Sequence, residues 1–178
     1  MTVPARTTTL VVMGVSGSGK TSVGEVIAKR LGWVFAEGDA FHPPANIEKM
    51  RSGHPLDDAD RLPWLRRLAE WIGEREAHGE NAVVTCSALK RSYRDLLRKD
   101  HPSVFFVHVT ASRQVLQQRL DDREGHYMPA SLLASQLDTL EPLQPDEPGL
   151  TLTDPGNVDE VVEQLLRELP ADVERGGS

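Results

Sequence analysis

The stretch Gly14-Val15-Ser16-Gly17-Ser18-Gly19-Lys20-Thr21 decides the fold of this chain. It matches the pattern Gly-x4-Gly-Lys-[Ser/Thr], whose glycines let backbone N–H groups turn toward phosphate oxygens. A helix that begins at such a loop adds the positive end of its dipole. In this pattern the lysine reaches the β- and γ-phosphates, and the hydroxyl that follows it is a Mg²⁺ ligand. We therefore predict that all eight residues bind ATP and that Thr21 is a metal ligand.

Strand and helix patterns alternate on both sides of this loop. Apolar, β-branched runs predict buried strands at 7–13, 33–36, 82–86, 104–109 and 150–153. Helical spacing predicts helices at 20–31, 43–52 and 89–99, and others that begin near 60, 112, 129 and 157. This alternation is typical of a parallel sheet covered on both faces. We predict an α/β, three-layer P-loop NTPase fold with a five-stranded parallel sheet, formed by residues 1–170 as one domain, and a disordered tail at 171–178.

Three helix starts carry specific expectations. Asp60 is expected to cap a helix whose apolar stripe begins at Trp64. Ser112 is expected to cap a helix that turns Val115, Leu116 and Leu120 inward, and Asn157 with Glu160 forms a capping box pattern.

Composition narrows the class of partner. The chain has 27 acidic and 20 basic residues and a net charge of −7, which argues against nucleic acid as a partner. A single cysteine, Cys86, excludes an intrachain disulfide and a cysteine zinc cluster. No apolar run approaches the ~18 residues of a membrane span, and no signal peptide is recognisable. We expect a cytoplasmic protein with no membrane partner.

A phosphate-binding loop by itself does not separate kinases, GTPases and ATPase motors. GTPases commonly carry Asn-Lys-x-Asp, which this chain lacks, and motors usually carry an acidic residue at the end of a central strand. Here the strand at 82–86 is followed by Ser87, and no carboxylate is present. A kinase for a small molecule remains. A sensor that binds ATP without turnover is the alternative from another class.

Asp39 is the first candidate for chemistry, because it follows the strand at 33–36 and should lie opposite the phosphate-binding loop. A carboxylate there can orient or deprotonate an attacking hydroxyl and can help to hold Mg²⁺. The alternative interpretation is an ordinary turn aspartate before a helix.

A dense polar run follows Asp39 and includes His42, Asn46, Lys49 and Arg61. We interpret it as a substrate cradle within an insertion at about 40–78, in which amides and carboxylates hold hydroxyls and basic groups hold an anionic end. A solvated helix surface is the alternative. Lys90 and Arg94 lie one turn apart after the strand at 82–86 and are candidates for binding a substrate anion or a phosphate, with a solvated helix surface again as the alternative.

Arg119 and Arg123 are also one helical turn apart, at the end of the helix after the strand at 104–109. They are candidate catalytic and ATP-binding residues at the base of a lid at about 123–140, whose closure brings positive charge to the phosphates. A charged helix end is the alternative.

The motifs together resemble the gluconokinase family of the bacterial thermoresistant type, over residues 9–168. The matching stretches are Gly14 to Thr21, Glu37-Gly-Asp-Ala-Phe-His-Pro43, Asn46-Ile-Glu-Lys-Met50, Gly53-His-Pro-Leu-Asp57, Asp60-Arg-Leu-Pro-Trp-Leu65, Cys86-Ser-Ala-Leu-Lys90, Tyr93-Arg-Asp-Leu-Leu-Arg98 and Arg123-Glu-Gly-His-Tyr-Met128.

This resemblance implies a fold like the nucleoside monophosphate kinases and shikimate kinase, and transfer of phosphate from ATP to D-gluconate with Mg²⁺, by a homodimer. It implies that Asp39 is the catalytic carboxylate, with Lys20 and the lid arginines neutralising charge, and that Arg61 or Lys90 holds the gluconate carboxylate. Glu37 stands where the family often has Asp. A kinase for another sugar acid, for shikimate or for a nucleoside monophosphate is the remaining enzyme alternative.

Overall fold

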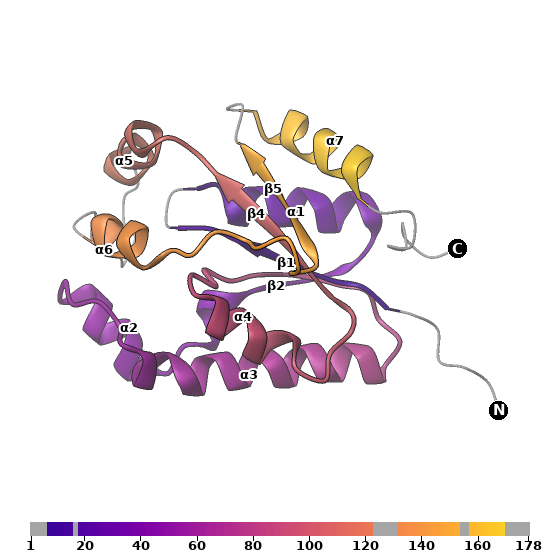
Figure 1. Cartoon of the computed structure of the whole chain (residues 1–178), viewed down its shortest axis with the longest axis horizontal. Coiled ribbons are helices and arrows are strands. Elements are labelled where there is room, and N and C mark those ends of the chain that lie inside the picture. The colour runs from indigo at the N-terminus through magenta and orange to yellow at the C-terminus, as the bar shows by residue number, and fades with distance from the viewer. Residues whose placement is uncertain (1–6, 16–17, 123–131, 154–156, 170–178) are drawn as a thin grey trace.

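The computed structural model describes residues 7–15, 18–122, 132–153 and 157–169. Its centre is a parallel sheet in the order β2-β3-β1-β4-β5 (Figure 1). The predicted α/β fold with a five-stranded parallel sheet is confirmed within these ranges, and each strand lies within about one or two residues of its prediction. The strands are β1 (Thr9–Met13), β2 (Val34–Glu37), β3 (Ala82–Thr85), β4 (Val104–Thr110) and β5 (Gly149–Thr153).

Helices cover both faces of the sheet. In Figure 1, α1 (Lys20–Leu31) and α7 (Val158–Glu168) lie above the sheet, and α3 (Asp58–Ala77) and α4 (Arg91–Arg98) lie below it. The carboxyl end of β2 leads through the short helix η1 (Gly38–Phe41) to α2 (Pro44–Arg51), and that of β4 leads to α5 (Arg113–Asp122). These two helices and α6 (Leu132–Thr139) gather on the left of Figure 1, so this edge receives the strand ends and the segments that follow them.

The alternation of side chains along β1 divides the core into two clusters. Leu10 and Val12 pack on the side of α1 and α7, whereas Val11 and Met13 pack on the side of α3 and α4. All four side chains have no exposed surface. Because each such side chain contributes about 1.5–3 kcal/mol when fully buried, the central strand is fixed in register and holds the loop after Met13 in place.

One of the three predicted helix caps is a different residue in the structure. Asp57, and not Asp60, caps α3: its Oδ1 accepts a 2.7 Å hydrogen bond from the Asp60 backbone N–H, and Asp60 Oδ2 accepts a 3.0 Å bond from the Asp57 N–H. The two aspartates form a reciprocal capping box, so the helix begins three residues earlier than a cap at Asp60 would place it. Asn157 caps α7 as predicted, accepting from the N–H groups of Asp159 and Glu160.

The residue that caps α5 was predicted correctly, but one of the residues predicted to face inward does not. Ser112 Oγ accepts a 3.2 Å hydrogen bond from the Val115 N–H, and Leu116 is buried. Val115, predicted to point inward, is 41% exposed, because only one of these two adjacent residues faces the sheet. The Leu120 side chain lies outside the description. Among the described helices, none is both long enough and apolar enough to cross a membrane.

Candidate active site

The phosphate-binding loop joins β1 to α1 at the centre of the sheet edge. Gly19 precedes α1 with a left-handed backbone (φ 91°), and a Cβ on Gly14 would come within 2.7 Å of the Val109 carbonyl oxygen. Both positions therefore require glycine. The first turn of α1 carries no acidic residue, so its N-terminus presents positive charge to an anion. Ser16 and Gly17 lie outside the described residues.

Thr21 contacts the end of β2. Its hydroxyl donates a 2.7 Å hydrogen bond to Oε1 of Glu37. In the described ranges no group of three or more His, Cys, Asp or Glu side chains is arranged to hold a metal ion. Mg²⁺ usually takes one or two protein oxygens and completes its shell with phosphate and water. The oxygens of Thr21 and Glu37 fit such a site. From the sequence, Glu37 was noted only as a departure from the family pattern, and no contact was predicted for it.

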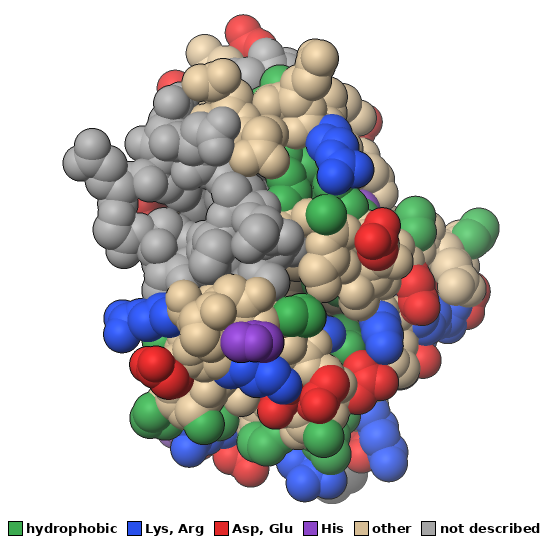
Figure 2. All heavy atoms as spheres, turned by 90° about the vertical axis from the view of Figure 1, so that its left-hand side faces the viewer, with side chains coloured by type: hydrophobic (Ala, Val, Ile, Leu, Met, Phe, Trp, Pro, Cys, Tyr) green, Lys and Arg blue, Asp and Glu red, His purple; other side chains and the backbone are tan. Residues whose placement is uncertain are grey.

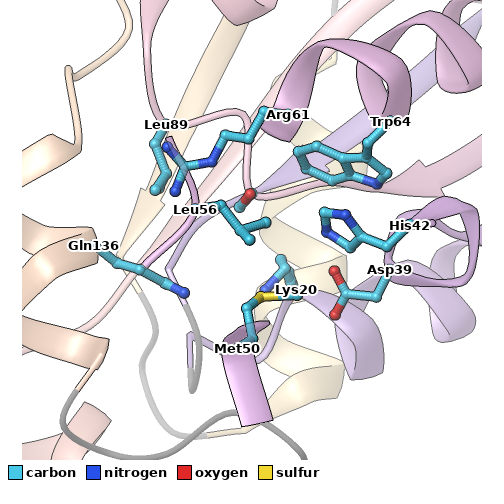
Figure 3. A pocket seen from close by; sticks show the side chains of 10 residues that line it. Lys20, Asp39, His42, Met50, Leu56, Arg61, Trp64, Leu89 and Gln136 are labelled. Atoms are coloured by element: carbon cyan, nitrogen blue, oxygen red, sulfur yellow. The ribbon is translucent and has the colours of Figure 1, made fainter. Parts of the chain in front are cut away.

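A pocket opens beside this loop (Figure 3). Figure 3 shows Asp39, His42 and Trp64 on one side of the pocket, Gln136 on the other, and Arg61 entering from a third direction. Residues from separate parts of the chain line it, namely Lys20, Asp39, His42, Met50, Leu56, Arg61, Trp64, Ser87, Leu89 and Gln136. The structure thus brings together four residues that the sequence predicted for the site: Lys20, Asp39, His42 and Arg61.

The position of Asp39 is fixed by the residue before it. The Gly38 N–H donates a 3.1 Å hydrogen bond to Thr85 Oγ1, and the Gly38 carbonyl accepts a 2.7 Å bond from Trp64 Nε1. A Cβ on Gly38 would lie 1.9 Å from the Thr85 carbonyl oxygen. The turn that carries Asp39 is therefore pressed against β3 and tied to α3.

His42 is packed into the pocket wall. Its ring stacks on Trp64 with centroids 4.2 Å apart and an interplanar angle of 16°. Burial lowers the pKa of His42 to about 4, with Asp39 opposing the change and Arg61 adding to it. The imidazole is consequently neutral near pH 7.

Asn46 and Lys49 do not line the pocket but connect α2 to the start of α3. Asn46 Nδ2 donates a 2.8 Å hydrogen bond to the Asp60 carbonyl oxygen and lies 3.2 Å from His42 Nδ1. Lys49 Nζ lies 2.6 Å from Asp60 Oδ2. In the structure both residues thus contact the start of α3, and substrate binding by either one stays a prediction.

Arg61 is held from behind by a chain of polar contacts. Its Nη1 donates a 2.8 Å hydrogen bond to the Tyr93 hydroxyl, which donates to Asp58, and Lys90 Nζ lies 3.0 Å from the same Asp58 oxygen. Hydrogen bonds from Tyr93 and Lys90 lower the pKa of Asp58, and burial together with the bond to Asp58 raises the pKa of Tyr93. Of the two basic residues considered for a substrate carboxylate, Arg61 lines the pocket and Lys90 does not.

Arg94 is a correction to the prediction. Its side chain is fully buried and forms a 2.6 Å ion pair with the equally buried Glu147, while its Nη1 donates a 2.9 Å hydrogen bond to the Ala88 carbonyl. Burial acts to raise the pKa of Glu147, but the bonds from Arg94 and the Gln144 N–H outweigh it and the pKa is lowered. The prediction that Arg94 binds substrate is wrong, because its guanidinium is already paired and shielded.

The predictions for the lid arginines and for the lid itself fall wholly or partly outside the described residues. Arg119 lies in α5, but its side chain is outside the description, and Arg123 is outside it entirely. Of the predicted lid, only the part from 132 onward is described, and it contains α6.

Several site residues were not predicted. Trp64 was assigned to a core stripe, and the pocket residues Met50, Leu56, Ser87, Leu89 and Gln136 received no role. Gln136 has no signal in the sequence, since α6 is brought to the pocket only by the fold. Cys86 directly precedes the pocket residue Ser87 and is buried. Burial raises the pKa of its thiol to about 12, so it is an unreactive core residue.

The chain is similar to known proteins over most of its length. A protein-family model described as an AAA domain matches residues 10–143. A gluconokinase of Gluconobacter oxydans (strain 621H) is 55% identical over 163 residues, which are 92% of each chain. The chain belongs to the gluconokinase family. The resemblance drawn from the sequence motifs is thereby confirmed.

Two solved structures support the gluconokinase family assignment. A sugar kinase from Janibacter sp. HTCC2649 is 52% identical and superposes with a TM-score of 0.86, covering 90% of this chain and 93% of its own. A gluconokinase from Sinorhizobium meliloti 1021 is 50% identical, with a TM-score of 0.79 and 91% coverage of both chains. The kinase fold is therefore shared over nearly the whole chain.

Proposed function

We propose that this chain transfers the γ-phosphoryl group of ATP to the terminal hydroxyl of D-gluconate, giving 6-phospho-D-gluconate and ADP. One observation carries the proposal: a single pocket presents Lys20 of the phosphate-binding loop, the carboxylate of Asp39 and the guanidinium of Arg61. These groups suit a phosphoryl donor, a reacting hydroxyl and a substrate carboxylate, respectively. The name of the Gluconobacter oxydans relative, a gluconokinase, supports the same acceptor.

Asp39 is the group proposed to orient or deprotonate the attacking hydroxyl. The turn at Gly38 holds it at the pocket, and the neighbouring imidazole of His42 is neutral, so it does not neutralise the carboxylate as an ion pair. Lys20 is proposed to neutralise charge on the transferred phosphoryl group. Both roles depend on positioning, which provides most of the catalysis in phosphoryl transfer.

Arg61 is the group proposed to bind the substrate carboxylate. It lines the pocket with its guanidinium held by Tyr93, whereas Lys90 is engaged with Asp58. A planar guanidinium also matches a carboxylate better than an ammonium does. The sequence left Arg61 and Lys90 as alternatives, and these contacts support Arg61 in the proposal.

Mg²⁺ is the metal proposed for the reaction. The Thr21 hydroxyl, which donates a hydrogen bond to Glu37, would hold it, and Asp39 would help to hold it through water. When bound, Mg²⁺ would neutralise charge on the β- and γ-phosphates. Arg119 and Arg123 remain proposed lid residues that would add positive charge when the site closes.

The family resemblance also supports a homodimer and a cytoplasmic location as proposals. The described surface that receives the strand ends shows basic and acidic side chains interspersed, with hydrophobic ones scattered (Figure 2). Such a surface suits small ligands better than it suits a polyanion.

The test measures ADP release from Mg·ATP with a panel of acceptors: D-gluconate, other aldonates, glucose, shikimate, AMP and CMP. We expect release that depends on gluconate and a product phosphorylated at the terminal carbon. In parallel, Asp39→Asn should lower kcat by about 10²-fold or more, as expected for loss of a general base. Turnover with a different acceptor would overturn the substrate assignment. ATP binding with no acceptor-dependent release would favour the sensor.

A further inference from the structure

The surroundings of His42 determine which of its ring nitrogens carries the proton. One face of the ring lies on Trp64, and Nδ1 lies 3.2 Å from Nδ2 of Asn46. No described residue forms a hydrogen bond with Nε2 in the structure. The remaining edge of the ring belongs to the pocket wall.

The amide of Asn46 can be oriented without ambiguity. Its Nδ2 lies 2.8 Å from the backbone carbonyl oxygen of Asp60, which can only accept a hydrogen bond. The atom at that position must therefore be the amide nitrogen and not the amide oxygen. The same nitrogen carries a second N–H, and its other contact is His42 Nδ1.

An amide nitrogen is a donor only, so His42 Nδ1 must accept. A neutral imidazole has one proton, which then resides on Nε2. The alternative tautomer, with the proton on Nδ1, would place two donors against each other in a buried contact and leave both unsatisfied.

We propose that Asn46 holds His42 in the Nε2–H tautomer, and that Nε2–H donates a hydrogen bond to an acceptor oxygen of the sugar acid in the pocket. His42 is then a residue that determines specificity, and Asn46 is a positioning residue that acts through it. The second half of the proposal rests on the proposed function, because the identity of the ligand oxygen follows from gluconate. The first half rests on the protein alone.

The tautomer makes the two sides of the pocket chemically different. Asp39, as a carboxylate, accepts a hydrogen bond from the hydroxyl that it orients, whereas His42 donates one. The hydroxyls of a polyol chain can both donate and accept hydrogen bonds. A polyol can therefore lie between the two residues, with one hydroxyl donating to Asp39 and another oxygen accepting from His42. An acceptor that lacks an oxygen opposite His42 loses one hydrogen bond, which corresponds to about tenfold in affinity.

Asn46→Asp is the decisive variant. It replaces the donor beside Nδ1 with an acceptor of the same size, which favours the Nδ1–H tautomer and converts Nε2 into an acceptor. His42→Gln and His42→Asn form a matched pair that does not depend on Asn46. The longer Gln amide can place a donor near the position of Nε2, whereas the Asn amide ends near Nδ1.

The experiment combines nitrogen NMR with steady-state kinetics on the full-length chain. Two-bond ¹H–¹⁵N correlation spectra at pH 8 report the protonated nitrogen of each imidazole, and the His42 signals are those that His42→Gln removes. In the wild type we expect His42 to be protonated on Nε2, and in Asn46→Asp on Nδ1. Because the proton has moved to Nδ1 in Asn46→Asp, KM of this variant for gluconate should rise about tenfold, while its kcat and its KM for ATP change less than about twofold. His42→Gln should retain a lower KM for gluconate than His42→Asn.

Three results would overturn the proposal: wild-type His42 protonated on Nδ1, a tautomer change in Asn46→Asp with no change in KM for gluconate, or equal KM values for the two His42 variants. Circular dichroism confirms that each variant is folded. If wild-type chain phosphorylated no acceptor, the substrate contact would be withdrawn together with the proposed function. The tautomer assignment would still be decided by the nitrogen spectrum alone.

Discussion

Nη1 of Arg61 donates a 2.8 Å hydrogen bond to the hydroxyl of Tyr93, and that hydroxyl donates in turn to Asp58. The Arg61 guanidinium also lies 5.3 Å from the centroid of the Tyr93 ring. An arginine that lines the pocket is thus held in place by a tyrosine behind it. The side chain of an unrestrained arginine has many rotamers, and ordering it on substrate binding has an entropic cost.

Removal of the Tyr93 hydroxyl should therefore weaken gluconate binding without touching the reacting groups. For Tyr93→Phe we expect KM for gluconate to rise about three- to tenfold, the equivalent of one hydrogen bond, with kcat nearly unchanged. Arg61→Met should raise the same KM further. The control is Lys90→Met, which removes the partly exposed ion pair with Asp58 and a contact 5.6 Å from the Tyr93 ring centroid but leaves the Tyr93 hydroxyl in place, and it should change KM less than about twofold. A larger effect from Lys90→Met than from Arg61→Met would transfer the carboxylate contact to Lys90.

The contact between Gly38 and Thr85 leads to a second prediction. Gly38→Ala places a methyl group 1.9 Å from a backbone carbonyl oxygen, so the turn that carries Asp39 must move away from β3. Because a displacement of about 1 Å at a catalytic group can cost about 10²-fold, kcat should fall by that order. Stopped-flow or steady-state turnover with saturating ATP and gluconate measures it.

Gly79→Ala is the matched control for that variant. Gly79 has a left-handed backbone (φ 67°) between α3 and β3, and a Cβ there meets nothing within 4 Å. We expect a loss of stability of about 1 kcal/mol and wild-type kcat. A folded Gly38→Ala protein with unchanged kcat would show that the turn does not position Asp39.

The buried pair of Arg94 and Glu147 predicts a defect in stability. The pair ties α4 to the segment that follows α6, and both side chains are fully buried. Glu147→Gln leaves the arginine charge without a counterion, which should lower the free energy of unfolding by about 3 kcal/mol in urea denaturation. Replacing both partners with apolar residues, Arg94→Met with Glu147→Leu, should recover much of that loss. Asp146→Asn, at an exposed partner of Arg91, is the control and should change stability little.

Much of the fold could be predicted because it follows from local pattern. The central strands β1 and β3 are short apolar runs that are buried on both faces, so they show no polar alternation that could have been misread, whereas the edge strands β2 and β5 are only partly buried. The error at Asp60 shows the limit: both Asp57 and Asp60 are good capping residues, and only the reciprocal contact in three dimensions identifies which one precedes the helix. Val115 was misplaced for a similar reason, since it and Leu116 are both apolar.

The site was predicted less completely, because a residue type does not reveal its partner. Lys90 and Arg94 are both basic and one turn apart, yet Arg94 is paired with Glu147, a residue 53 positions away in sequence. Asn46 was predicted to bind substrate, but its contacts with His42 and with the Asp60 carbonyl depend on the packing of α2 against α3. Such long-range pairings are not encoded in any local pattern.

His108 gives the last prediction, which concerns pH. It lies in β4 with Nδ1 buried and without a hydrogen-bond partner among the described residues, and burial, with Arg94 adding to the effect, lowers its pKa to about 4. Below pH 6.5, the ordinary pKa of histidine, His108 becomes protonated in the unfolded chain but stays neutral in the folded chain. Protonation therefore stabilises the unfolded state, and the free energy of unfolding decreases as the pH falls from 6.5 toward 4. Between pH 7 and pH 5 the loss from His108 should be about 2 kcal/mol, and His42 should contribute a similar loss. Urea denaturation at pH 7, 6 and 5 measures the slope, and His108→Met should remove about half of it. Parallel pH dependence in the variant and the wild type would show that His108 is not held neutral by its burial in the sheet.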